Sequence, residues 1–166
     1  MEMLHFAPDG FIPNNPILPF VCYRAAFDLG ARDVEQSIIR HFAGNGWGDA
    51  WINGIYPFQH YHATAHEVLG IARGRARVQF GGPHGPELEV AAGDAVLIPA
   101  GVGHCRLDMS ADLSVIGAYP EGQSADLRRD TASDHQGAAT RIAAVPRPRL
   151  DPVTGAAFTL PPPRGA

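Results

Sequence analysis

The chain has 166 residues, of which 45% are hydrophobic and 18% charged, and its formal net charge is −4. This length suits one globular domain. An acidic chain without a Lys/Arg run lacks the basic face that nucleic-acid binding requires, so we expect no nucleic-acid partner.

Membrane insertion and secretion are not expected either. No apolar run approaches the roughly 20 residues that cross a bilayer, and the start MEMLHFAPDG lacks the basic and apolar regions of a secretory signal. The two cysteines, Cys22 and Cys105, are far apart and have no CxxC spacing. These features favour reduced thiols in a cytoplasmic protein.

Residues 1–50 read as an N-terminal arm followed by a helix. The arm FIPNNPILPFVCYRAAF predicts one strand within residues 18–27, which Pro19 confines to a sheet edge or a strand start. The next stretch, ARDVEQSIIRHFAGNG, opens with Asp33 and Gln36 in a pattern resembling a capping box and ends in Gly-Asn-Gly. One amphipathic helix that covers a sheet is therefore predicted, with apolar residues at helical spacing: Val34, Ile38 and Phe42.

Residues 51–120 change to short apolar runs and period-two patterns separated by Gly, Pro or Asp. In RARVQF, for example, Ala76, Val78 and Phe80 share one face of a strand. Nineteen glycines and fifteen prolines support many turns. Seven strands in a barrel or jelly roll are therefore predicted, at residues 55–61, 67–73, 75–80, 88–91, 95–98, 105–108 and 113–119.

Residues 121–166 read as a C-terminal extension. The stretch EGQSADLRRDTASDHQGAATR is polar and weakly helical at best. The tail IAAVPRPRLDPVTGAAFTLPPPRGA is rich in proline and is predicted to run extended over the surface. Since we find no internal repeat, a single β domain is expected.

Two segments carry the candidate chemistry. In HYHATAHEVLG, His60 and His62 project from the same face of a strand, and Glu67 can return on the next strand after the ATAH turn. In GDAVLIPAGVGH, His104 follows the Pro99-Ala100-Gly101 turn. Three imidazoles and one carboxylate suit a divalent transition metal: Fe, Mn, Ni, Co or Zn.

The spacing of these segments resembles the two motifs of the cupin superfamily. The first runs Gly54, five residues, His60-Tyr61-His62, four residues, Glu67, six residues, Gly74. The second runs Gly93, five residues, Pro99, one residue, Gly101, two residues, His104, and it places Asp108 where these motifs usually end in Asn. The flanks FIPNNPILPF, WINGIYPFQHYHATAHEVLG and DPVTG are also similar to the YjlB-type group of bacterial cupins, which implies no particular activity.

The resemblance implies an all-β fold, the double-stranded β-helix or jelly roll, and metal ligands at His60, His62, Glu67 and His104. It also implies a small-molecule substrate or ligand and a homodimer. We expect a small metal-dependent enzyme, with dioxygenase-type chemistry slightly favoured over isomerase or lyase chemistry, and Glu67 as a candidate proton acceptor. The alternative is a non-catalytic cupin that binds or senses a sugar or another metabolite.

Two residues that each adjoin a candidate ligand, His66 and Cys105, have competing interpretations. His66 adjoins Glu67 and should face the opposite way on a strand, so it is either a hydrogen-bonded structural histidine or a residue that supports the ligands. A zinc-protease HExxH pattern is excluded, because Gly70 stands where its second histidine would be. Cys105 should likewise face away from His104, which favours a buried structural thiol over a Cys–His nucleophile.

Overall fold

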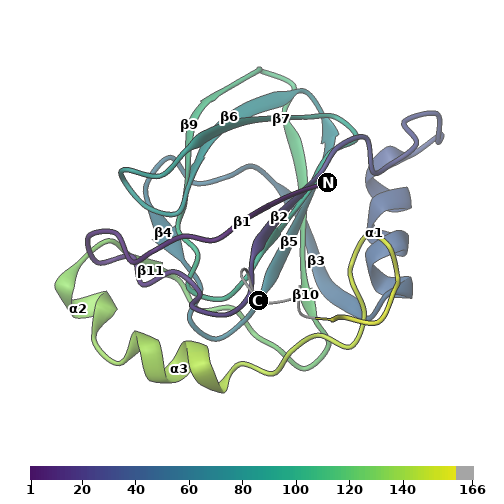
Figure 1. Ribbon diagram of the computed structural model, residues 1–166. Helices are drawn as coiled ribbons and strands as arrows, with labels where there is room; N and C mark the ends of the chain where they lie inside the picture. The colour runs from purple at the N-terminus through teal and green to yellow at the C-terminus, as the bar shows by residue number, and fades with distance from the viewer. Residues whose placement is uncertain (160–166) are drawn as a thin grey trace.

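The computed structural model describes residues 1–159, which form two antiparallel sheets with helices outside them (Figure 1). The six-stranded sheet has the order β1 (Glu2–Leu4), β2 (Phe20–Tyr23), β8 (Ala95–Ile98), β5 (Glu67–Arg73), β10 (Ser114–Pro120) and β3 (Trp47–Asn53). The five-stranded sheet has the order β11 (Arg128–Arg129), β4 (His60–Tyr61), β9 (His104–Met109), β6 (Arg75–Phe80) and β7 (Glu87–Ala91). The predicted jelly roll is confirmed. A closed barrel was the wrong expectation, because within residues 1–159 the strand pairing forms two separate sheets.

The main hydrophobic core lies between the sheets. Alternation along β5 sends Leu69 and Ile71 into this core, and on β6 it sends Val78 and Phe80 there. Glu67 lies two residues before Leu69 at the start of β5, so it shares the inward face of that strand.

The predicted N-terminal helix is α1 (Val34–Gly44), which packs on the outer face of the six-stranded sheet (Figure 1). Asp33 caps it by accepting a 3.0 Å hydrogen bond from the backbone N–H of Gln36. Ile38 and Phe42 are buried against the sheet, where Gly70 leaves room for them. A Cβ at residue 70 would lie 2.8 Å from Cγ2 of Ile38.

One predicted strand is mostly a loop, and one strand was not predicted. Residues 55–59 form a loop in place of the first part of a strand, since Pro57 cannot donate to a ladder, and only His60–Tyr61 remain as β4. The unpredicted strand Trp47–Asn53 carries a left-handed residue at Asp49 and pairs irregularly with β10, which hides its period-two pattern. The arm strand β2 begins directly after Pro19 as predicted, but it lies between β1 and β8 and not at the edge.

The C-terminal extension contains two helices that were not predicted, α2 (Ala132–His135) and α3 (Ala138–Ala144). Tertiary packing explains α3, because Ala138 and Ile142 bury themselves against Ile12, Tyr61 and Ala63. The prediction of an extended tail falls partly on residues 160–166, which lie outside the described residues.

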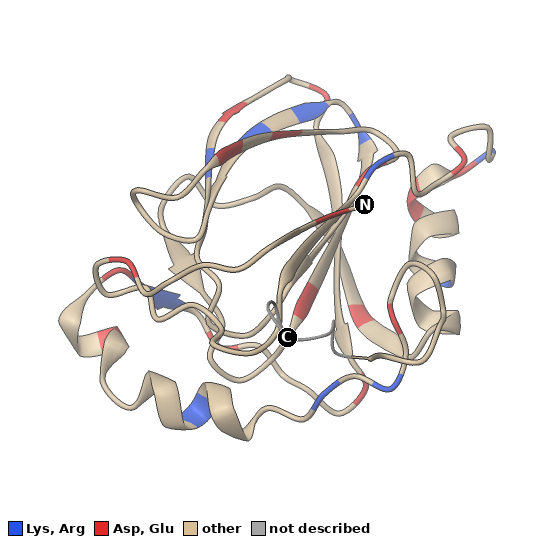
Figure 2. Cartoon of the chain, in the orientation of Figure 1, with Lys and Arg blue, Asp and Glu red and all other residues tan. Residues whose placement is uncertain are grey.

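Charged residues of both signs are interspersed along the chain (Figure 2). On β6 and β7, Arg77 and Glu87 form an ion pair of 2.7 Å, and Arg75 and Glu89 form one of 3.6 Å. Within residues 1–159, every helix falls short of the length and apolar character needed to cross a membrane.

Candidate metal centre

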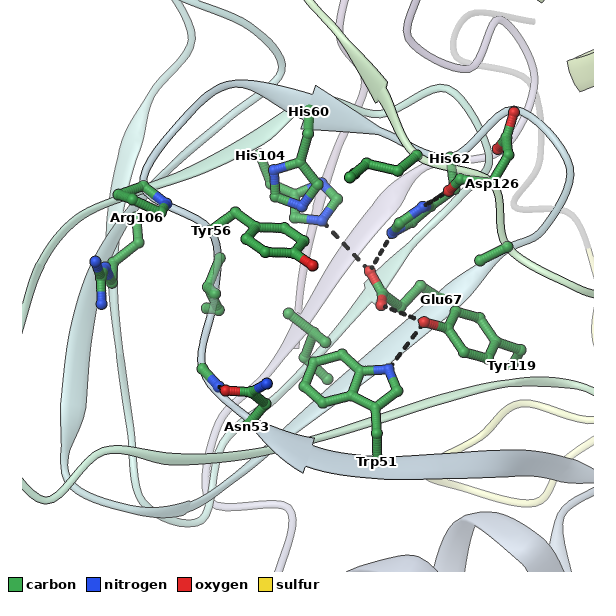
Figure 3. A pocket seen from close by; sticks show the side chains of 16 residues that line it. Trp51, Asn53, Tyr56, His60, His62, Glu67, His104, Arg106, Tyr119 and Asp126 are labelled. Atoms are coloured by element: carbon green, nitrogen blue, oxygen red, sulfur yellow. Dashed lines mark hydrogen bonds and ion pairs between the residues drawn. The ribbon is translucent and has the colours of Figure 1, made fainter.

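A cavity of about 480 Å³ opens beside the ends of several strands (Figure 3). Its lining includes His60 from β4 and His104 from β9, which are paired residues of adjacent strands. His62 follows β4 directly, and Glu67 opens β5. The structure therefore brings together the four residues that the sequence singled out: His60, His62, Glu67 and His104.

Three of these residues, His60, His62 and His104, form a cluster that could hold a metal ion. One ring nitrogen from each lies within 4.8 Å of the corresponding nitrogen of the other two. His60 and His104 are almost fully buried, and their rings lie 3.9 Å apart between centroids. His62 lies beyond the end of β4, yet its ring is only 5.9 Å from that of His60.

Backbone carbonyls fix how the three rings present their nitrogens. Each Nδ1 hydrogen-bonds to a carbonyl oxygen, and because a carbonyl only accepts, each Nδ1 must carry a proton. In neutral imidazoles the lone pairs are then on Nε2, the atom that remains to face the cavity. The three pairs are His60 with Phe58 (2.9 Å), His104 with Val102 (3.1 Å) and His62 with Asp126.

Glu67 places a carboxylate oxygen against the same nitrogens. Its Oε2 lies 3.2 Å from Nε2 of His62 and 3.3 Å from Nε2 of His104. Two ligands about 2.1 Å from one ion and at right angles to each other would be about 3 Å apart. The donor set therefore fits a metal ion, since its spacing suits shared coordination and its Nε2 and carboxylate lone pairs converge.

The electrostatics of the cluster favour positive charge beside the Glu67 carboxylate, which a metal ion would supply in place of a proton on His62. Burial lowers the pKa of His62, but the Glu67 carboxylate outweighs burial and raises that pKa to about 9. Burial raises the pKa of Glu67, but the charge of His62 and the hydrogen bonds with both histidines hold that pKa well below its usual range. Burial and the adjacent His104 lower the pKa of His60 to about 2. A buried carboxylate is thus stabilised by positive charge among the imidazoles.

Two residues that the sequence left unassigned hold Glu67 from its other side. The Tyr119 hydroxyl donates to Oε1 of Glu67 at 3.2 Å, and Nε1 of Trp51 donates to that hydroxyl at 2.8 Å (Figure 3). Trp51 can lie there because its partner across β10 is Gly117, where a Cβ would be 2.1 Å from the indole ring. Tyr119 lies on β10, which pairs with both β3 and β5, and this pairing brings it between Trp51 and Glu67.

Asp126 supports the segment between His62 and Glu67. Its carboxylate accepts hydrogen bonds from the backbone N–H groups of Ala63 (2.7 Å) and Thr64 (3.3 Å), and from Arg128 (2.8 Å). Its own carbonyl accepts from His62. The polar stretch 121–141, which gave no functional signal in the sequence, thus holds the turn of the first motif.

His66 and Cys105 stand apart from the cluster. His66 lies at a second cavity, accepts the Ala100 N–H on Nδ1 at 2.9 Å, and has its pKa lowered by burial to about 4. The bond to Ala100 joins the two motif segments, which agrees with a structural histidine. Cys22 and Cys105 are both free and buried, and burial raises the pKa of each thiol.

No family model matches the chain. Among solved structures, procruciferin, an 11S globulin from Brassica napus, is 20% identical with a TM-score of 0.42, over 49% of this chain and 23% of the globulin. Acireductone dioxygenase from Bacillus anthracis, with a cadmium ion in its active centre, is 14% identical with a TM-score of 0.42, over 64% of this chain and 80% of the dioxygenase. The chain thus spans less than a quarter of the globulin.

A curated relative matches much more strongly. "Uncharacterized protein YjlB" of Bacillus subtilis (strain 168) is 41% identical over 151 residues, which cover 90% of this chain and 88% of the relative. This similarity runs through both histidine segments and their flanks. The protein therefore belongs to the YjlB family, the group that its motifs and flanks resemble.

Proposed function

We propose that the protein is a metal-dependent enzyme that acts on a small oxygenated organic molecule. One observation carries this proposal: three imidazoles meet within 4.8 Å of one another inside a cavity of about 480 Å³. Buried, convergent donors beside a cavity of this size suit a metal site with room for a small ligand.

The proposed ligands are His60, His62, Glu67 and His104. Three neutral imidazoles and one carboxylate leave a formal charge of +1 on a divalent ion, which favours an oxygen-rich substrate such as an enediol, catechol, hydroxy acid or keto acid. Mixed nitrogen and oxygen donors suit Fe, Mn, Ni, Co or Zn. Such an ion would supply Lewis acidity, and iron would also supply redox capacity. Dioxygenase-type chemistry is the reaction class that we favour.

The chain's own residues would orient the substrate and move its proton. Trp51, Tyr56 and Leu69 line the cavity and would shape the space for the substrate. Glu67 is the proposed proton acceptor, because its carboxylate lines the cavity and its Oε2 faces the histidines. The Tyr119 hydroxyl donates a hydrogen bond to the other carboxylate oxygen, Oε1. This bond orients the carboxylate so that Oε2 is the atom that would accept the proton.

Metal analysis of protein purified without oxygen, followed by oxygen-uptake assays with catechols, diketones and thiols, tests this proposal. We expect one equivalent of metal per chain, lost in His104→Gln and retained in His84→Gln, whose side chain is 87% exposed. Substrate-linked oxygen consumption by the iron form would support a dioxygenase. Metal content that His104→Gln leaves unchanged would contradict the proposed site.

The alternative function is a non-catalytic cupin that binds or senses a sugar or another metabolite. The aromatic side chains of Trp51 and Tyr56 at the cavity favour it, since aromatic faces and polar tips suit such ligands. A protein that binds a metabolite but turns over none of the compounds above, with or without metal, would support this alternative.

We also propose a cytoplasmic homodimer. The free thiols of Cys22 and Cys105 suit a reducing compartment. Within residues 1–159, strand β1 lies at the edge of the six-stranded sheet and pairs only with β2, so a second chain can extend the sheet at that edge. Light scattering after size-exclusion chromatography that gives the mass of one chain at micromolar concentrations would exclude the dimer.

A further inference from the structure

One arginine lines the cavity, Arg106, and no carboxylate within residues 1–159 forms an ion pair with it. Arg106 follows His104 by two residues on β9, so both side chains project from the same face of that strand. Figure 3 shows Arg106 at the end of the cavity away from Glu67 and Tyr119. The proposed metal centre and the Arg106 guanidinium therefore lie at different ends of one cavity.

The other charged groups of this cavity already have partners. Asp126 is paired with Arg128, and Glu67 with the histidines. Arg106 forms no ion pair within residues 1–159, and the partner of its guanidinium there is the Met109 sulfur, at 2.7 Å from Nη1. A thioether is a weak, neutral acceptor, so the guanidinium retains its charge and most of its five donors for a ligand.

The backbone holds Arg106 beside the aromatic wall. Its N–H donates to the carbonyl oxygen of Tyr56 at 3.0 Å, which ties β9 to the loop that carries this ring. Two residues along a strand span about 6.5–7 Å. Because His104, Leu69 and Arg106 line one cavity, we expect a small organic acid to extend from the histidine cluster past the apolar wall toward the guanidinium.

We propose that Arg106 determines substrate specificity by binding an anionic group at the end of the substrate distant from the histidine cluster. The substrate class is small acids that chelate through adjacent oxygens at one end and carry a carboxylate at the other. This inference rests on the proposed metal site. A guanidinium also binds phosphate bidentately, so a terminal phosphate shares the recognition chemistry.

Binding of matched acids to the Co(II)-loaded protein, followed by the visible spectrum of the ion, tests the role of Arg106. 2-Hydroxyglutarate and 2-hydroxypentanoate share the chelating hydroxy acid but differ by a distal carboxylate in place of a methyl group. We expect 2-hydroxyglutarate to bind at least about ten-fold more tightly, as a charge-assisted pair allows. Phosphoglycerate with its phosphate on the terminal carbon tests whether phosphate is accepted in place of carboxylate.

Arg106→Gln should bind the two hydroxy acids with similar affinities, and Arg106→Lys should recover part of the preference. The matched control is Arg77→Gln, an exposed arginine of β6 that is paired with Glu87 of β7 and should keep the full preference when replaced. Circular dichroism and cobalt content verify that each variant folds and loads. Equal affinities in the wild type, or a preference that survives in Arg106→Gln, would overturn the inference.

The outcomes separate this inference from the proposed function. If both acids change the cobalt spectrum and bind with equal affinities, the metal site stands and the role of Arg106 fails. If the folded protein takes up no cobalt, or neither acid changes the spectrum, the proposed function and the inference fail together.

Discussion

The Tyr119 hydroxyl donates a 3.2 Å hydrogen bond to Oε1 of Glu67, while Oε2 of the same carboxylate lies 3.2 Å from Nε2 of His62. The two sheet strands β10 and β5, which are hydrogen-bonded neighbours, thus fix the carboxylate relative to the imidazoles. Nε1 of Trp51 in turn donates to the Tyr119 hydroxyl. Two successive hydrogen bonds, from Trp51 to Tyr119 and from Tyr119 to Glu67, therefore orient the carboxylate that we propose as a metal ligand.

Tyr119→Phe should weaken metal binding by roughly ten-fold, because partners that orient a ligand contribute about 10–100-fold to metal affinity. Competition with a chromophoric chelator for Zn(II) measures this change. The matched control is Tyr23→Phe, which removes a hydroxyl bonded to Asp151 at 2.5 Å, away from the cluster. Zn(II) affinity equal to that of the wild type in Tyr119→Phe would show that Glu67 needs no such support.

The sequence predicted the ligand candidates because their relationships are local. His60 and His62 are two residues apart, and short turns separate each motif histidine from the next strand. Tyr119 and Trp51 reach Glu67 only through the pairing of β10 with both β3 and β5. Such register is set by contacts between distant segments, so a single sequence leaves it undetermined.

The same reasoning explains the errors in the fold. Helix α1 carried its own signals, a capping residue at Asp33 and apolar residues at helical spacing, and it was predicted correctly. Helix α3 is stabilised largely by where Ala138 and Ile142 dock, and strand β3 follows the irregular path required beside β10. Tertiary packing determines these two elements, so local pattern could not identify them.

The indole of Trp51 depends on the absence of a side chain at Gly117. Gly117→Ala would place a Cβ 2.1 Å from the ring, so the ring must move and Tyr119 loses its donor. We expect unfolding in urea to show a loss of about 1–3 kcal/mol in the free energy of unfolding. Gly48→Ala on β3, where nothing lies within 4 Å of the added Cβ, should be close to neutral. Equal stabilities of these two variants would contradict the packing argument.

Asn14 joins the N-terminal arm to the segment just before His104. Its buried side chain donates to the carbonyl oxygens of Ala7 (2.7 Å) and Gly81 (2.8 Å) and accepts from the Gly103 N–H (3.2 Å). Its backbone has a φ of 54°, a left-handed conformation that Asn tolerates better than most residues. We therefore expect Asn14→Ala to lose about 2–4 kcal/mol of stability from unsatisfied groups and backbone strain.

Asn14→Gly separates these two causes, since glycine adopts a left-handed φ without a steric penalty. It should retain about 1 kcal/mol more stability than Asn14→Ala in thermal or urea unfolding. Both variants should also weaken Zn(II) binding, because Gly103 adjoins His104. If both variants keep the metal affinity of the wild type, Asn14 serves the fold alone.

The contact between Gly70 and Ile38 sets how closely α1 approaches the sheet. Gly70→Ala would bring a Cβ within 2.8 Å of Cγ2 of Ile38 and within 3.1 Å of the Phe42 ring, so overpacking should cost about 1–3 kcal/mol. Ile38→Ala alone should cost about 2–5 kcal/mol by leaving a cavity.

The double variant Gly70→Ala/Ile38→Ala decides whether these two costs share one cause. If the added Cβ occupies space vacated by Ile38, the double variant should be more stable than the sum of the single losses predicts, by at least about 0.5 kcal/mol. Urea unfolding of all four proteins completes the cycle. Additive losses would mean that Gly70→Ala acts through Phe27, Phe42 or the strand backbone, because relief at residue 38 would then leave its cost unchanged.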